Sequence, residues 1–223
     1  MSRIIRAEEG EIFDIELAED LLKANKVLAM KNKKLLSKHG ITAIDVMGSV
    51  GTGKTSLIGQ IVHKLKENYR IAVIAGDLTT TIDADRIAKH GAEVIQINTG
   101  KECHLDANLV KKALKMIDLS KIDVLFIENV GNLICPAEFP LGSDKRIVVI
   151  SLTEGPFMVV KHPFIFMETD IAVINKMDLV DVLDIDVNKL ERDISRVNPK
   201  ANIVKVSCRN GMGILDLIKV LEL

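Results

Sequence analysis

Seven short runs of mostly valine and isoleucine, separated by stretches with helical spacing, constrain the fold of this 223-residue chain more than any other feature. The runs are ITAIDVM (41–47), IAVIAG (71–76), EVIQI (93–97), DVLFIE (123–128), RIVVIS (146–151), DIAVIN (170–175) and NIVKVS (202–207). Most are nearly continuous in apolar residues, as expected of strands that are covered on both faces. Strands that alternate with helices predict an α/β fold with a doubly wound, mostly parallel sheet.

Helical spacing of apolar residues predicts the elements between these strands. The expected helices span 54–68, 83–90, 105–117, 186–197 and 213–221. An additional N-terminal helix is predicted at about 16–38, where leucines recur at helical spacing before His39-Gly40. This helix could cover a face of the sheet or pack on a second subunit. No repeat or long linker divides the chain, so we expect one domain over 1–223, with the strands and their helices in about 41–223.

Charge and composition narrow the class of protein. Lys and Arg number 30 against 31 Asp and Glu, so the balance favours neither nucleic acid nor a membrane surface as a partner. No apolar run approaches the roughly 20 residues that span a bilayer. The charged first twenty residues do not resemble a signal peptide, and we therefore expect a cytoplasmic protein.

A glycine-rich loop, GSVGTGKTS, follows the first strand and opens the next helix. It fits the pattern G-x-x-x-x-G-K-[ST], in which backbone N–H groups and a helix N-terminus surround phosphates. Lys54 would contact the β- and γ-phosphates, and the Thr55 hydroxyl would bind Mg²⁺. The predicted nucleotide contacts of the loop are Gly48, Ser49, Gly51, Thr52, Gly53, Lys54, Thr55 and Ser56.

The stretch INKMDL identifies the expected base. It resembles the N-K-x-D signature of GTP-binding proteins, with Asn175, Lys176 and Asp178 directly after a strand. The Asp178 carboxylate would accept hydrogen bonds from guanine that adenine does not offer. Ser207 and Cys208, in VSCRNGMG, stand where the last guanine loop is expected. A small-molecule kinase with the same phosphate loop should lack this signature.

Two acids follow neighbouring strands at the expected phosphate end. Glu128, with Gly131 three residues on, resembles the D-x-x-G element that senses Mg²⁺ and the γ-phosphate. Asp77 could bind Mg²⁺ or orient the attacking water. We therefore assign Lys54, Asp77 and Glu128 to catalysis, and Thr55, Asp77 and Glu128 to Mg²⁺. Asp77 as a turn residue, and Glu128 as an ion pair of Lys54, are the structural alternatives.

The cysteines raise a separate possibility. Cys103-His104 and Cys135 each follow the carboxyl end of a strand, where doubly wound sheets bind their ligands. Two thiolates and an imidazole suit Zn²⁺ or Ni²⁺. Alternatively, the cysteines are buried apolar residues and His104 caps the helix that starts near Leu105. Cys208 is interpreted as a packing residue.

Read together, GTGKTS, NTGKECHLDANLV, FIENVGNLICPAEFPLG, TEGP and INKMDL resemble the hydrogenase nickel-incorporation GTPases of the HypB family. The resemblance implies a P-loop fold of the SIMIBI class, with Cys103, His104 and Cys135 binding Ni²⁺ or Zn²⁺ at a GTP-dependent homodimer interface. It also implies nickel delivery to [NiFe] hydrogenase, with a HypA-type metallochaperone and the hydrogenase large subunit as partners. Lys161 resembles a lysine that reaches toward the other subunit's nucleotide.

A mechanism follows from this resemblance as a hypothesis. The γ-phosphate would move the segment from Glu128 to Gly131, and Cys135 lies four residues further on, so metal binding would depend on the nucleotide. No arginine stands at an evident finger position, and hydrolysis is expected to be slow. Alternatives are a chaperone for another nickel or cobalt enzyme such as urease, and a non-catalytic metal sensor or buffer. The segment after Glu154-Gly155 departs from the acidic pattern of relatives.

Overall fold

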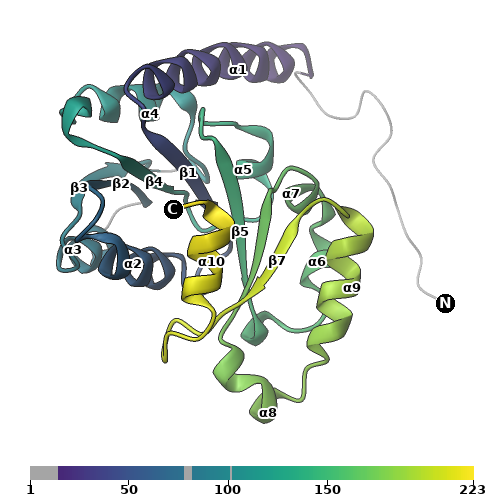
Figure 1. Cartoon of the computed structure of the whole chain (residues 1–223). Coiled ribbons are helices and arrows are strands. Elements are labelled where there is room, and N and C mark those ends of the chain that lie inside the picture. The colour runs from purple at the N-terminus through teal and green to yellow at the C-terminus, as the bar shows by residue number, and fades with distance from the viewer. Residues whose placement is uncertain (1–14, 78–81, 101) are drawn as a thin grey trace.

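The computed structural model describes residues 15–77, 82–100 and 102–223, and its centre is a sheet of seven parallel strands (Figure 1). Their order across the sheet is β3-β2-β4-β1-β5-β6-β7. The strands are β1 (Thr42–Met47), β2 (Ile71–Asp77), β3 (Glu93–Asn98), β4 (Val124–Glu128), β5 (Lys145–Ser151), β6 (Ile171–Asn175) and β7 (Asn202–Lys205). Each corresponds to one of the seven apolar runs, and the pairing is parallel throughout, so the predicted fold class is confirmed.

Ten α-helices surround the sheet in the described residues. They are α1 (Ile15–Lys38), α2 (Lys54–Leu65), α3 (Ile82–Ala88), α4 (Ala107–Leu114), α5 (Cys135–Glu138), α6 (Met158–Lys161), α7 (Pro163–Met167), α8 (Val180–Leu183), α9 (Val187–Val197) and α10 (Ile214–Leu221). All six predicted helices are present, some shorter than expected. The sequence did not predict α5 to α8, because helices of four or five residues are too short to show a helical period.

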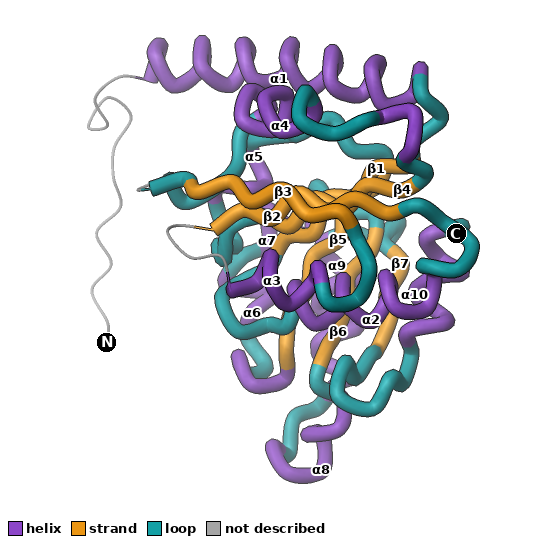
Figure 2. Tube along the Cα trace, turned by 90° about the vertical axis from the view of Figure 1, so that its left-hand side faces the viewer, coloured by secondary structure: helices purple, strands orange, loops and turns teal. Residues whose placement is uncertain are grey.

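Helices cover both faces of the sheet, but the two faces are built differently (Figure 2). On one face, α2, α3 and α10 pack against a single apolar cluster that crosses six of the strands, from β2 to β7. On the other face there are two separate clusters. One lies under α4 and the end of α1 and includes residues of β2 and β4, while the other lies between β5, β6 and helices α6, α7 and α9. The second face therefore has a seam near the central strand β1.

The N-terminal helix lies along α4 (Figures 1 and 2). Two buried asparagines attach it to the chain beneath. The Asn25 side chain accepts from the Ala107 amide at 2.8 Å and donates to the Pro140 carbonyl at 2.9 Å. The Asn32 amide donates to the carbonyls of Ala107 and Leu141 at 2.8 and 3.1 Å. The helix thus covers α4 and the adjoining part of one sheet face, and its packing on a second subunit stays a prediction.

Within the described residues, no helix is long and apolar enough to cross a membrane. The first fourteen residues, which carry most of the argument about a signal peptide, lie outside the described part of the chain.

Because all seven strands are parallel, their carboxyl ends meet at one edge of the sheet. The residues that the sequence assigns to a nucleotide or a metal lie at the last positions of these strands, or in the loops and first helical turns that follow β1, β2, β3, β4, β6 and β7. The topology therefore gathers these residues at this one edge.

Candidate functional site

The loop between β1 and α2 is ordered around the side chain of Lys54. The Lys54 ammonium is buried and donates to the carbonyl oxygens of Gly48 and Ser49, at 2.9 and 3.0 Å. The Thr52 hydroxyl also donates to the Ser49 carbonyl, at 3.0 Å. The loop thus holds a positive charge at the N-terminus of α2, where the helix dipole also favours an anion.

Gly53 brings the phosphate loop against the loop that follows β6. Its φ of 96° lies in the left-handed region, and a Cβ atom there would collide with the Asn175 side-chain amide. That amide donates to the Thr52 carbonyl at 2.8 Å, so the two loops are joined directly. Glycine is required here both by conformation and by this close approach.

A cavity of about 430 Å³ opens beside the phosphate loop. It is lined by Val50, Gly51, Gly53, Lys54, Thr55, Ser56, Gly76, Asp77, Arg86, Glu128, Asn129, Gly131 and Lys176. The Thr55 hydroxyl donates to Glu128 Oε1 at 2.7 Å, and Asp77 lines the same cavity. Hydroxyl and carboxylate oxygens are the ligands that Mg²⁺ prefers. The donor set therefore fits a magnesium ion beside a bound phosphate.

Arg86 is a residue of this cavity that the sequence analysis missed. It lies on α3, and its guanidinium donates to the Ser56 hydroxyl at 3.3 Å. The sequence shows no arginine at an evident finger position, and Arg86 was not among the residues predicted for the site. The sequence signal that could have indicated it is the position of Arg86, nine residues after Asp77 on the helix that follows β2 and packs on α2.

A second cavity adjoins the first and contains the residues predicted to contact the base. It is lined by Gly53, Ser56, Asn175, Lys176, Asp178, Leu179, Cys208 and Arg209, of which the first two and Lys176 belong to both cavities. The Ser207 hydroxyl donates to Asp178 Oδ1 at 2.5 Å, and the Cys208 amide donates to Asn175 Oδ1 at 3.2 Å. Burial raises the pKa of the Cys208 thiol to about 11. The Asp178 carboxylate is thus held in place before any base arrives.

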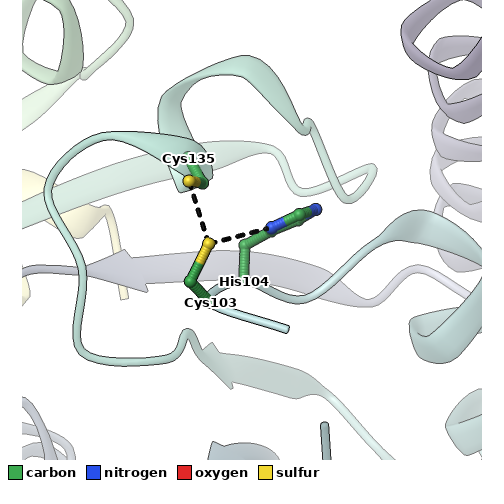
Figure 3. Close-up of side chains that lie close together, drawn as sticks. All are labelled: Cys103, His104 and Cys135. Atoms are coloured by element: carbon green, nitrogen blue, oxygen red, sulfur yellow. Dashed lines mark hydrogen bonds between the residues drawn. The ribbon is translucent and has the colours of Figure 1, made fainter. Parts of the chain in front are cut away.

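The two other cysteines and His104 lie together, as Figure 3 shows. The sulfur atoms of Cys103 and Cys135 are 2.9 Å apart, and Nδ1 of His104 is 3.8 Å from Cys103 Sγ. One potential ligand atom from each of the three residues lies within 4.8 Å of the others. These three residues form the Cys/His cluster, a donor set suited to a soft or borderline divalent ion.

Two irregular segments carry this cluster. Cys103 and His104 follow β3, whereas Cys135 is the first residue of α5. The His104 ring packs on Phe139, with 3.9 Å between the centroids, and burial lowers its pKa, which favours the neutral imidazole that binds metals. Burial also raises the pKa of the Cys135 thiol, so metal binding there must displace a proton.

The suggestion that His104 caps the following helix is wrong. α4 begins at Ala107, and its N-cap is Asp106, whose carboxylate accepts from the Leu109 amide at 2.7 Å. A carboxylate two residues further along the chain thus replaces the imidazole in this role.

Gly131 and its neighbours connect the phosphate loop to the Cys/His cluster. A Cβ atom on Gly131 would collide with Val50 of the phosphate loop, and Asn132 forms a backbone bridge to Gly48. The Asn132 side chain donates to the Cys103 carbonyl at 3.3 Å. One short segment therefore contacts both sites.

Not every residue singled out in the sequence lies at these sites. Lys161 is exposed at the end of α6 and belongs to neither cavity. Glu154 instead completes a capping box with Ser151, accepting from the Ser151 amide at 2.8 Å. The contact of Lys161 with a second subunit stays a prediction.

A parallel sheet, a phosphate-loop motif at the end of β1 and an N-K-x-D stretch after β6 are typical of a P-loop nucleotide-binding protein, here with a Cys/His cluster near the phosphate loop. Residues 42–205 match the family described as CobW/HypB/UreG, nucleotide-binding domain. The "Probable hydrogenase maturation factor HypB" of Methanocaldococcus jannaschii is 53% identical over 208 residues, which cover 93% of this chain and 94% of that protein. The chain belongs to the HypB family.

Solved structures agree with this assignment. The crystal structure of HypB from Helicobacter pylori in complex with nickel is 35% identical, with a TM-score of 0.85 over 89% of this chain and 94% of that chain. The signal recognition particle receptor FtsY from Elizabethkingia anophelis, 15% identical with a TM-score of 0.55 over 88% of this chain and 72% of that chain, shares the fold alone. The expected SIMIBI type of P-loop fold is thereby confirmed.

Proposed function

We propose that this protein is a GTP-hydrolysing metallochaperone that binds nickel at the Cys/His cluster and delivers it during the maturation of [NiFe] hydrogenase. The observation that carries this proposal is the approach of Cys103, His104 and Cys135 to one another, with Asn132 linking the Cys103 backbone to the phosphate loop. The nickel-bound HypB structure from H. pylori, which this chain resembles over most of its length, supports the choice of nickel over zinc.

The nucleotide in this proposal is GTP, bound across the two adjoining cavities. The backbone of Gly48–Ser56 and the Lys54 ammonium hold the phosphates, and Asp178 accepts hydrogen bonds from guanine. Asn175 braces the two loops, while Lys176 lies along the base. The selection of guanine follows from the Asp178 carboxylate, whose side chain is 17% exposed. Adenine offers it no matching donors, and a partly buried carboxylate that lacks them is costly.

Thr55, Asp77 and Glu128 hold Mg²⁺, which neutralises charge on the β- and γ-phosphates when bound. Asp77 or Glu128 orients the attacking water, and Lys54 stabilises the charge that develops on the phosphates. The reaction is slow, because the residues that line the cavity position the nucleotide but no other protein supplies an arginine finger.

Nickel is the cargo. The γ-phosphate of GTP acts on Gly131 and thereby on Cys135, so the geometry of the Cys/His cluster differs between GTP and GDP states. With three protein ligands, a fourth position stays open for water, a second copy of this chain or the receiving protein. A homodimer, a HypA-type chaperone and the hydrogenase large subunit are the partners in this proposal.

The test is a measurement of Ni²⁺ affinity with GDP and with a non-hydrolysable GTP analogue, in the wild-type protein and in Cys135→Ala. We expect the two nucleotide states to differ at least about fivefold in the wild type and the variant to bind Ni²⁺ weakly in both. Equal wild-type affinities would exclude nucleotide-controlled release, and wild-type affinity in Cys135→Ala would exclude the assigned ligand.

The same titrations with Zn²⁺ distinguish the cargo. In cells, Lys54→Ala separates the proposal from a passive metal buffer, because a buffer needs the Cys/His cluster and no nucleotide. Full hydrogenase activity in a Lys54→Ala strain grown at low nickel would favour the buffer.

A further inference from the structure

The central strand β1 carries a charged residue inside the sheet face that is divided by the seam. Ala43, Asp45 and Met47 alternate along β1 and therefore point to the same face. Ala43 belongs to the apolar cluster under α1 and α4, and Met47 belongs to the cluster under α6, α7 and α9. Asp45 lies between them with no exposed surface. A charge at such a position is costly and calls for a specific reason.

Asp45 is linked through Arg146 to the segment that carries Cys135. Arg146 is the register partner of Asp45 on β5, and its side chain is 13% exposed. The guanidinium donates to the Pro136 carbonyl at 2.6 Å and to the Ala137 carbonyl at 3.4 Å. These are the two residues that follow Cys135 in α5. The Arg146 side chain therefore fixes the position of α5 above the sheet.

Asp45 is also linked, through Asn129, to the segment that carries His104. The side-chain amide of Asn129 donates to Asp45 Oδ1 at 3.3 Å. Its oxygen accepts from the amide of Leu105, next to His104, at 3.0 Å, and from the Val130 amide at 3.1 Å. Asn129 directly follows Glu128 at the end of β4 and lines the nucleotide cavity. The fully buried Asn129 side chain thus contacts the backbone of Leu105, next to His104, and belongs to a residue that lines the cavity beside the phosphate loop.

We propose that Asp45, Arg146 and Asn129 form a coupling network that positions the two ligand-bearing segments relative to each other and makes their separation depend on the nucleotide. The inference rests on the proposed function and adds to it the residues that transmit the change. None of the three is a metal ligand or a catalytic residue; they are positioning residues.

The centre of the network has room to change. Nε of Arg146 and Oδ2 of Asp45 face each other at 3.6 Å, and neither atom has a hydrogen-bond partner among the described residues. A charge-assisted hydrogen bond is shorter, about 2.7–2.9 Å. A displacement of less than 1 Å would therefore close this contact, and we take the closed contact as the second arrangement of the network. Burial raises the pKa of Asp45 to about 6, consistent with a carboxylate that Arg146 only partly compensates.

The experiment measures the ratio of the two Ni²⁺ dissociation constants, with GDP and with a non-hydrolysable GTP analogue, in full-length protein. Asp45→Asn keeps the shape of the side chain and removes its charge. Arg146→Lys keeps the charge and loses the planar fork that reaches Asp45 and the carbonyls of Pro136, Ala137 and Glu168 together. Asp193→Asn is the matched control, because Asp193 is a largely buried aspartate paired with Lys189 on α9, outside the network.

We expect a ratio of at least about fivefold in the wild type and in Asp193→Asn. In Asp45→Asn and Arg146→Lys the ratio should fall to within about twofold of one, while GTP affinity without metal is retained. Circular dichroism and thermal unfolding establish whether each variant is folded. If Asp45→Asn is not folded, the affinity ratio of Arg146→Lys tests the proposal.

Two results would overturn the inference, and they differ in what else they exclude. If the wild type has a ratio of one, nucleotide-controlled nickel release fails and the network fails with it. If the wild type has a clear ratio that both network variants keep, with affinities lowered equally in the two states, the residues only stabilise the fold and the proposed function stands.

Discussion

The phosphate loop and the Cys/His cluster lie at the same edge of the sheet but are built in opposite ways. The phosphate loop is a single continuous stretch between β1 and α2, and its lysine is already bonded to the loop's own carbonyls. The Cys/His cluster joins two segments whose cysteines are 32 residues apart, on a short helix and an irregular loop. The first arrangement holds its ligand by a preformed shape, whereas the second can change its geometry when either segment moves.

The largest effect is expected from a substitution that disrupts the Cys/His cluster and leaves the phosphate loop intact. Cys103→Ala removes one of three ligands and should weaken Ni²⁺ binding by about 100-fold or more, since even outer groups of metal sites contribute 10- to 100-fold. GTP affinity in metal-free protein should change less than twofold. Titration calorimetry measures both. Cys208→Ala is the matched control, because that cysteine lies in the base cavity and should leave Ni²⁺ binding intact.

The converse change breaks the phosphate loop alone. Lys54→Ala removes charged hydrogen bonds to the phosphates and should cost about 2–3 kcal/mol of GTP binding, or roughly 30- to 150-fold. Ni²⁺ affinity without nucleotide should stay within twofold of the wild type. Lys66→Ala, an exposed lysine just after α2, serves as the control for a lost surface charge. A large loss of Ni²⁺ affinity in Lys54→Ala would show that the two sites are one unit.

Arg86 tests which part of the nucleotide the α3 side of the cavity holds. Ser56, which Arg86 contacts, lines both cavities, and we therefore expect Arg86 to bind a phosphate close to the nucleoside. Arg86→Ala should then weaken GDP and GTP equally, by about tenfold or ~1.4 kcal/mol. Arg192→Ala on α9 is the control. An unchanged GDP affinity with slower GTP hydrolysis would instead assign Arg86 to the γ-phosphate.

The smallest effect concerns the cysteine that belongs to the nucleotide region. Because burial raises the pKa of Cys208 to about 11, and because the thiolate is the reacting form, iodoacetamide should label it slowly at pH 8. The labelling rate should rise about tenfold per pH unit between pH 8 and 10. Peptide mass spectrometry measures this rate. A rate that is already constant between pH 8 and 9 would contradict the raised pKa.

The same contrast explains how much of the molecule could be predicted from the sequence. GSVGTGKTS and INKMDL are local patterns whose spacing reflects a strand, a loop and a helix in succession, so the strands, the phosphate loop and its contacts to Asn175 follow from them. The Cys/His cluster was expected because both of its segments follow strands of a parallel sheet and because the motifs around them resemble the HypB family. Its distances depend on packing between segments and needed the structure.

Other features had no local signal at all. The coupling between Asp45 and Arg146 joins two strands that are distant in sequence, and an aspartate within an apolar run gives no indication of its partner. Arg86 belongs to a short helix whose direction decides which cavity it lines. The choice between Asp106 and His104 as helix cap depended on where α4 begins, and helix boundaries are the least certain part of a sequence-based prediction.

The two asparagines of α1 have a consequence for which parts of the chain can shift. Asn25 and Asn32 tie the start of α4, just after His104, to Pro140 and Leu141, just after α5. The segment that follows His104 and the segment that follows α5 are thus both hydrogen-bonded to the same helix, α1. These four hydrogen bonds favour a rearrangement in the residues nearer the phosphate loop, so a displacement there would change the distance between the two sulfur atoms more than the positions of whole helices.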